Sequence, residues 1–182
     1  MRELSLNVLD IAQNSIAANA TCITLWVTES VSQNRLILGI EDNGRGMTEE
    51  QLQRVRDPFF TTRTTRRVGM GIPLFRMAAE MAGGSLTIDS TLGKGTVVTA
   101  AFLLDHIDRP PLGDMVGTVS ALIRLNPQLD FVYRHQTDSG SFEADTRSFR
   151  EILGEVPLNE PDIVQWIEGY LTENVQALNS QA

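Results

Sequence analysis

A short glycine-rich turn after a strand-like segment most constrains how this chain can fold. The turn is Asp42-Asn43-Gly44-Arg45-Gly46-Met47. Segments 22–29 and 35–41 alternate apolar and polar residues, as half-buried strands do, with a turn at 33–34. The two glycines permit a tight backbone directly beyond the second strand, where Asp42 places a carboxylate. Such a turn is often only a loop, so its meaning depends on its neighbours.

The surrounding sequence predicts alternating helices and strands. Apolar residues recur at helical spacing over residues 4–18. Thr48 with Gln51 three residues later is typical of a capped helix start. The remaining elements predicted before residue 107 are a long Thr- and Arg-rich loop over 57–68, a helix over 73–81 with Pro73 in its first turn, and strands over 85–90 and 96–104.

A proline-containing linker at 107–112 divides the predicted organisation in two. Residues 1–106 are predicted to form one domain. Residues 113–182 are predicted to form a small α+β module. Its predicted elements are a helix over 113–125, a hairpin of 131–136 and 141–145, and two helices, the last with an apolar stripe at Ile163, Ile167, Tyr170 and Leu171 that permits a homodimer.

Charge and composition restrict the setting of the protein. A net charge of −8 argues against a nucleic-acid-binding surface, because phosphate contacts require clustered lysine and arginine. The cluster of Arg63, Arg66 and Arg67 suits a small anionic ligand better. The single cysteine excludes an internal disulfide and a multi-cysteine zinc site. No apolar run approaches the ~20 residues of a membrane span, and the N-terminus lacks a signal-peptide core. We therefore expect a cytoplasmic protein with no membrane partner.

Three further patterns carry possible chemistry. Glu3, Asn7, Asp10 and Asn14 share one stripe of the first predicted helix, where a carboxylate and an amide can hold Mg²⁺ and orient a nucleophile. The alternative is a solvated polar face. Gly69-Met70-Gly71 before a helix leaves N–H groups free for phosphate oxygens, although a hinge has the same pattern. Gly93-Lys94-Gly95-Thr96 is similarly either a ligand turn or a plain hairpin turn.

Taken in order, these motifs resemble the GHKL superfamily of DNA gyrase, heat-shock chaperone ATPases, sensor histidine kinases and mismatch-repair ATPases. The resemblance covers about residues 1–104. Residues 10–15 look like the N-box, Asp42–Met47 match the G1 box, residues 58–63 resemble the F-box of sensor kinases, and 69–71 resemble the G2 box. The resemblance implies the Bergerat fold, an α+β two-layer sandwich with a mixed or antiparallel sheet and helices on one face. The small C-terminal α+β module would be an addition to it.

The resemblance also implies ATP and Mg²⁺ as ligands and gives each motif residue a role. Asp10 would be the catalytic base, Asn14 the magnesium ligand, and Asp42 the acceptor for the adenine amine. Gly46 would let the base approach the backbone, and Thr96 would lie beside adenine. The other implied nucleotide-binding residues are Gly44, Met47, Arg63, Gly69, Met70 and Gly71, the last few at the base of a lid formed by residues 57–71.

Two departures and one absence bear on activity. Asp10 stands where relatives carry glutamate or asparagine, and its shorter side chain reduces its reach as a base. Pro73 stands where sensor kinases usually have glycine, which removes one N–H from the phosphate cradle. No phosphoacceptor hairpin is expected before the N-box, and His106 and His135 are interpreted as surface or packing residues. The layout is closest to free-standing bacterial regulatory ATP-binding proteins.

Three functions follow as hypotheses. The first is an ATP- and Mg²⁺-dependent regulatory protein that phosphorylates a protein partner or changes its affinity for one. The second is a slow stand-alone ATPase. The absence of any lysine after residue 111 counts against it, because the chaperone and repair ATPases that the chain resembles use a lysine from a following domain at the γ-phosphate. The third is a non-catalytic ATP-binding module.

Overall fold

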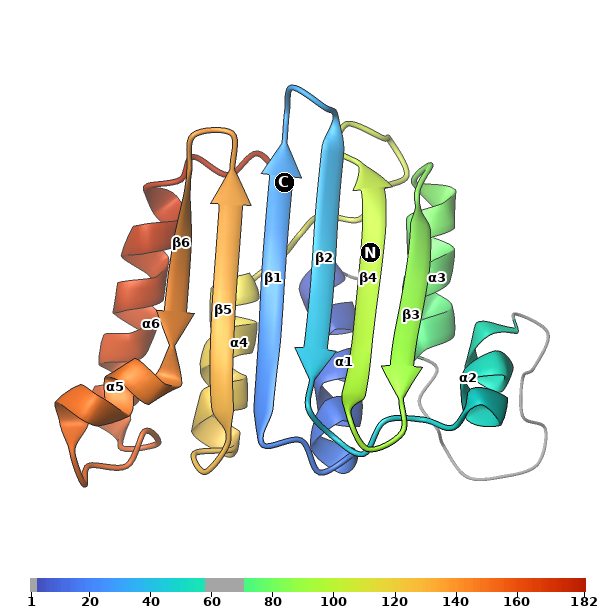
Figure 1. The fold of residues 1–182 in the computed structure, drawn as a ribbon. Helices are drawn as coiled ribbons and strands as arrows, with labels where there is room; N and C mark the ends of the chain where they lie inside the picture. Colours follow the sequence, from blue (N-terminus) through green and yellow to red (C-terminus); the bar gives the residue numbers. More distant parts are fainter. Residues whose placement is uncertain (1–2, 58–70) are drawn as a thin grey trace.

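The computed structural model describes residues 3–57 and 71–182 (Figure 1). Their helices and strands are α1 (Leu4–Ala17), β1 (Cys22–Ser30), β2 (Arg35–Asp42), α2 (Glu49–Arg56), α3 (Gly71–Met81), β3 (Ser85–Thr91), β4 (Gly95–Leu103), α4 (Met115–Leu125), β5 (Asp130–Thr137), β6 (Gly140–Asp145), α5 (Thr146–Leu153) and α6 (Pro161–Gln176).

One six-stranded sheet runs through the molecule in the order β3-β4-β2-β1-β5-β6. Neighbouring strands are antiparallel except for β1 and β5, which are parallel. Helices α1, α3, α4 and α6 lie on the same face of the sheet (Figure 1). The prediction of a two-layer α+β sandwich with a mixed sheet is therefore confirmed.

The core lies between the sheet and these helices. Alternation along β1 turns Ile23, Leu25 and Val27 toward the helices, and all three are fully buried. Helix α1 presents Leu4 and Val8 from the opposite layer. Burying each large apolar side chain contributes about 1.5–3 kcal/mol to the stability of the fold. The apolar face of α1 is therefore held against the sheet, which fixes the position of the polar stripe on the same helix.

Local sequence signals mark where several helices begin and end. Asn19 adopts a left-handed φ of 59° just after α1. Thr48 and Gln51 form the reciprocal capping box at the start of α2. Pro73 lies in the first turn of α3, which begins at Gly71 rather than near Pro73. Gly83, with a φ of 70°, follows α3.

The segment after the linker extends the same sheet. Strand β5 pairs with β1 from Cys22↔Asp130 to Thr28↔Gln136, and β6 forms the outer edge. The division into domain 1–106, linker 107–112 and module 113–182 stays a prediction about folding units. On α6, Ile167 and Leu171 are buried inside this chain, so the apolar stripe belongs to its own core and gives no support to the predicted homodimer.

A buried polar network joins β1, β5 and the C-terminal residues. Glu29 is 3% exposed and His135 is 1% exposed. His135 Nε2 lies 2.6 Å from Glu29 Oε1, and His135 Nδ1 lies 2.9 Å from the Tyr133 hydroxyl. The Ser180 hydroxyl donates to Glu29 Oε1 at 2.7 Å, and the Gln181 N–H donates to Oε2 at 2.8 Å. His135 is thus a packing residue, and Glu29 fastens the end of the chain to the sheet.

Across residues 3–57 and 71–182, no helix combines the length and apolar character that crossing a membrane would require.

Candidate nucleotide-binding site

Asp42 ends β2 with its carboxylate held on both oxygens. The Ser15 hydroxyl of α1 donates to Oδ2 at 2.6 Å, and the Gly44 N–H donates to Oδ1 at 2.9 Å. Asp42 is 8% exposed, so its orientation is set by α1 and by its own turn. Each carboxylate oxygen retains a lone pair for a further donor. A fixed carboxylate of this kind can accept a hydrogen bond from one N–H group of a ligand and so select for it.

Asn43 is a structural clamp. Its Oδ1 accepts the N–H groups of Thr21 and Cys22 at 2.8 and 2.9 Å, and its Nδ2 donates to the Thr21 hydroxyl at 2.8 Å. Two residues further along, Arg45 donates its N–H to the Ala18 carbonyl at 2.9 Å. The turn is therefore tied to the segment between α1 and β1, which keeps Asp42 next to α1.

Two glycines let the turns of the site approach each other. Gly46 has a φ of +65°, and a Cβ there would lie 2.1 Å from the Thr91 carbonyl oxygen. Gly95 has a φ of +123°, and a Cβ there would lie 1.8 Å from the Asp42 carbonyl oxygen. Both positions exclude side chains on steric grounds. Gly46 thus lies directly against the β3–β4 turn, and the role in the approach of a base that the resemblance implies stays a prediction.

Ser90 forms hydrogen bonds with both Thr96 and Met47. Thr96 pairs with Asp42 on one side and with Ser90 on the other. The Ser90 hydroxyl lies 2.9 Å from the Thr96 hydroxyl and accepts the Met47 N–H at 2.9 Å. Ser15 and Ser90 are both missed by sequence reasoning. The hairpin register, with its turn at 91–95, could have placed Ser90 opposite Thr96. Ser15 lies within the N-box at residues 10–15, but that motif assigns no role to its hydroxyl.

Asp10 and Asn14 lie exposed on α1, one turn apart. Gly71 begins α3 beside Asp10, because a Cβ on Gly71 would lie 3.1 Å from the Asp10 Cβ. Glu3, at the start of the same polar stripe, is engaged elsewhere: its carboxylate accepts the Asp114 N–H at 3.4 Å. Helix α1 therefore carries Asp10 and Asn14, lies beside Gly71 and contacts Asp42 through Ser15.

The rest of the predicted site lies outside the described residues. This applies to Arg63, Gly69 and Met70, to Arg66 and Arg67, and to the predicted lid apart from Asp57 and Gly71. Within residues 3–57 and 71–182, no group of three or more His, Cys, Asp or Glu side chains is placed to hold a metal ion. Asn14 as a magnesium ligand stays a prediction.

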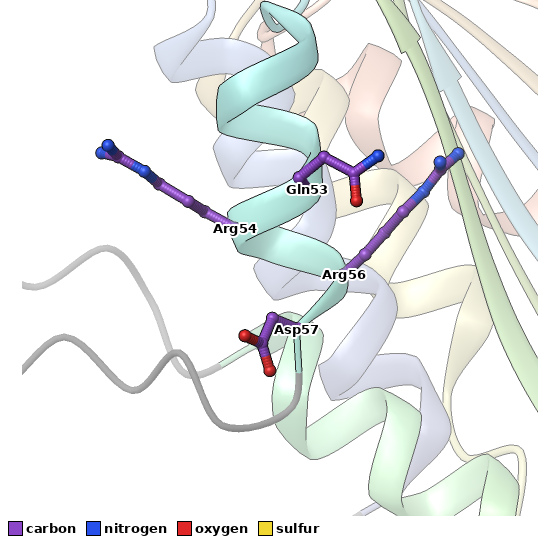
Figure 2. A pocket seen from close by; sticks show the side chains of 4 residues that line it. All are labelled: Gln53, Arg54, Arg56 and Asp57. Atoms are coloured by element: carbon purple, nitrogen blue, oxygen red, sulfur yellow. The ribbon is translucent and has the colours of Figure 1, made fainter.

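An open cavity of about 450 Å³ at the end of α2 is a separate feature (Figure 2). Its lining includes Gln53, Arg54, Arg56 and Asp57. Arg56 is committed to β3, where it donates to the Ile88 carbonyl at 2.6 and 3.1 Å and pairs with Asp89. Of its described lining residues only Asp57, at the start of the predicted lid, belongs to the predicted nucleotide site, so we do not assign the nucleotide to this cavity.

Comparison with known proteins agrees with this arrangement. Residues 1–106 match the family described as histidine kinase-, DNA gyrase B-, and HSP90-like ATPase. The C4-dicarboxylate transport sensor protein DctB of Pseudomonas aeruginosa is 34% identical over 54% of this chain and 16% of its own length. Sporulation kinase E of Bacillus subtilis is 31% identical over 53% of this chain and 13% of its own length.

A solved structure supports the fold alone. The crystal structure of the N-terminal domain of a DNA repair protein aligns with a TM-score of 0.53 at 15% identity, covering 80% of this chain and 52% of that one. The aligned part of this chain spans less than a fifth of each of the two curated relatives.

Proposed function

The chain belongs to the family of histidine kinase-, DNA gyrase B- and HSP90-like ATPases, and from this membership we propose that it is an ATP- and Mg²⁺-binding regulatory protein. In one form of the proposal it transfers the γ-phosphoryl group to a partner protein. In the other, nucleotide binding changes its affinity for that partner. The names of the two curated relatives, a sensor protein and a sporulation kinase, support a signalling role.

The observation that carries the proposal is the carboxylate of Asp42. It is nearly buried and held by Ser15 and Gly44, yet its oxygens can each accept another hydrogen bond. The exocyclic amine of adenine is a donor of the required kind, whereas guanine presents a carbonyl oxygen at the same ring position. Adenine therefore fits the acceptor, and ATP is preferred over GTP.

Removing the Ser15 hydroxyl tests this positioning. In Ser15→Ala, Asp42 loses its α1 donor and keeps only the Gly44 N–H, so we expect ATP affinity to fall about fivefold, the equivalent of about 1 kcal/mol. Isothermal titration calorimetry measures the change. Ser5→Ala is the matched control, because Ser5 is also buried on α1 but contacts Glu3 rather than Asp42. Equal affinities of the two variants would remove Ser15 from the site.

Asn14 and Asp10 suit the metal and phosphate end of the ligand. Mg²⁺ keeps several waters and is usually held by one or two protein groups plus phosphate oxygens, so a single amide oxygen from Asn14 is an adequate protein ligand. When bound, the ion would neutralise phosphate charge. Asp10 would accept a proton from the attacking hydroxyl or water. Gly71, at the start of the 11-residue helix α3, would direct N–H groups at phosphate, together with Gly69, Met70 and Arg63.

Replacing Asp10 with Asn separates binding from turnover. Because the amide cannot accept a proton, we expect transfer to fall at least about 100-fold while ATP affinity stays within about twofold. The assay uses ATP labelled in its γ-phosphate, Mg²⁺ and a lysate of the native host. Label on a protein indicates a kinase, and free phosphate indicates the ATPase alternative. Tight binding without either supports the switch. Asn7→Ala, on the same stripe, is the control, and unchanged turnover in Asp10→Asn would exclude Asp10 as the base.

A further inference from the structure

The end of the chain carries uncompensated negative charge. Residues 151–182 contain six acidic residues and no lysine, arginine or histidine. None of the six carboxylates forms an ion pair with another described residue. They are Glu151, Glu155, Glu160, Asp162, Glu168 and Glu173, and all are exposed.

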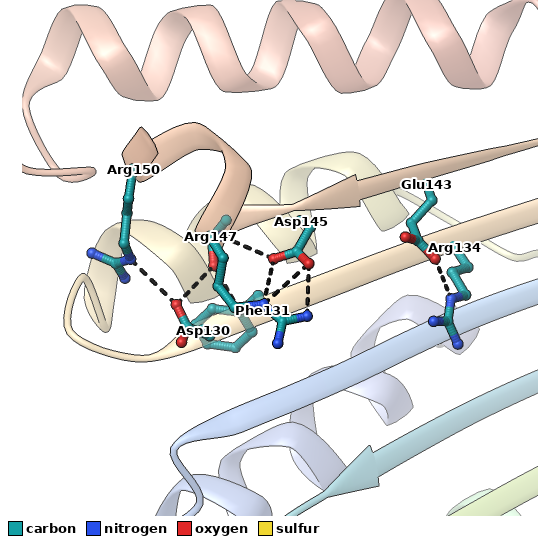
Figure 3. A network of polar contacts seen from close by, with 8 residues as sticks. Asp130, Phe131, Arg134, Glu143, Asp145, Arg147 and Arg150 are labelled. Carbon is teal, nitrogen blue, oxygen red and sulfur yellow. Dashed lines mark hydrogen bonds and ion pairs between the residues drawn. The ribbon is translucent and has the colours of Figure 1, made fainter. Parts of the chain in front are cut away.

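The arginines that precede this stretch are already paired. Arg147 binds Asp145 at 2.7 Å, Arg150 binds Asp130 at 3.2 Å, and Arg134 binds Glu143 across β5 and β6 (Figure 3). Arg150 also donates to the Pro127 and Leu129 carbonyls. These contacts fasten the start of α5 to the sheet. They leave no arginine of this region available to neutralise the acidic residues beyond it.

Three large apolar side chains in the same stretch of the chain are also exposed. Ile152 on α5 is 75% exposed, Val156 in the following turn is 45% exposed, and Trp166 on α6 is 43% exposed. The Trp166 ring is held in place, because it stacks on Tyr170 at 5.7 Å and meets Phe149 edge-on at 5.4 Å. Ile152 lies one helical turn beyond Phe149. An oriented, exposed tryptophan beside exposed aliphatic groups is typical of a protein-binding surface.

We propose that this acidic–aromatic surface, formed by Ile152, Val156, Trp166 and the nearby carboxylates of Glu151, Glu155 and Asp162, binds a cationic amphipathic segment of a partner protein. The segment would place apolar residues on Trp166 and Ile152 and basic residues on the carboxylates. The negative charge of the surface favours a cationic partner. A second copy of this chain, with its net charge of −8, or an anionic membrane would be repelled.

The surface is independent of the proposed nucleotide site. The two strands nearest it, β5 and β6, lie at one end of the sheet, whereas Asp42, Thr96 and Ser90 lie on β2, β4 and β3 toward the other end. Partner docking here therefore goes beyond nucleotide binding and would leave the Asp42 region accessible. Failure of either proposal leaves the other standing.

A model peptide tests the proposal directly. In Trp26→Phe protein, Trp166 is the only tryptophan and reports on the surface. The probe is a helical peptide of about 18 residues with leucine on one face and lysine on the other. We expect saturable binding, a shift of Trp166 fluorescence to shorter wavelength, and at least about tenfold weaker binding in 0.5 M salt than at low salt. A matched peptide with glutamate in place of lysine should not bind.

Paired charge variants locate the binding. With fluorescently labelled peptide, Glu151→Gln/Glu155→Gln and Ile152→Ser should each weaken binding about tenfold. The control, Glu41→Gln/Glu80→Gln, removes the same net charge from exposed positions on β2 and α3 and should bind as the parent does. Equal loss in both charge pairs would show a general charge effect and overturn the proposal. So would binding of the glutamate peptide, or binding of anionic phosphatidylglycerol vesicles in place of the peptide.

Discussion

Replacing Asp42 with Asn is expected to weaken ATP binding at least about 100-fold, the largest effect on binding of any single substitution. A charge-assisted hydrogen bond is worth about 1.5–3 kcal/mol, and an amide group that rotates its NH₂ toward the adenine amine would add repulsion between donors. The fold should tolerate the change. The new amide oxygen can still accept the Gly44 N–H, and the new NH₂ can donate to the Ser15 hydroxyl oxygen.

Calorimetry with ATP and GTP separates this effect from misfolding. The variant should keep the circular dichroism spectrum and urea midpoint of the parent while losing its preference for ATP over GTP. The control is Asn43→Asp, since Asn43 lies beside Asp42 but clamps Thr21 and Cys22, so its loss should lower stability more than nucleotide preference. Undiminished ATP affinity in Asp42→Asn would overturn the proposed site.

Glu29→Ala is expected to cause the largest loss of stability, about 3–5 kcal/mol in the free energy of unfolding. Removing a buried carboxylate leaves the groups that are hydrogen-bonded to it without a partner, and each such group costs about 1–3 kcal/mol. Here the loss would strand His135, Ser180 and the Gln181 N–H at once. Urea denaturation measures the change, and Ser180→Ala, which removes only one donor, should cost about 1 kcal/mol. Equal midpoints for Glu29→Ala and the parent would show that the network contributes nothing.

The same carboxylate should make stability depend on acid pH. Burial raises the pKa of Glu29, but hydrogen bonds from His135, Ser180 and Gln181 outweigh burial, so the pKa lies below its ordinary value of 4.5. A lowered folded-state pKa contributes stability that is complete above the unfolded value and is lost as pH falls through the folded value. The stability difference between the parent and Glu29→Gln should therefore be constant near neutral pH and shrink below about pH 4.5.

Much of the fold and part of the site could be predicted because their signals are local. Helical periodicity predicts α1, and the Thr48–Gln51 pair predicts the start of α2. The family resemblance and the two-layer sandwich follow from motifs whose order along the chain is directly visible. The hairpin register, once β3 and β4 are predicted, also brings Thr96 beside Ser90.

Contacts between distant segments could not be predicted in this way. Nothing in the sequence near residues 130–137 indicates that β5 pairs with β1 and not only with β6, because strand pairing is decided by the whole sheet. The hydrogen bond from the Ser15 hydroxyl to Asp42 joins two segments that are distant in the sequence, so it is known only from the structure. Glu29 and His135 lie far apart in the chain, so their pairing emerges only when β1 and β5 are side by side.

The parallel pairing of β1 with β5 has a consequence for a chain still being synthesised. Strand β1 obtains its antiparallel neighbour β2 soon after translation, but its other edge has no partner until residues 130–137 have been made. During that interval an apolar strand would present unpaired N–H and C=O groups, a template for pairing between nascent chains. Pairing with β5 covers this edge of β1, so we expect the chain to aggregate less once residues 130–137 have been made.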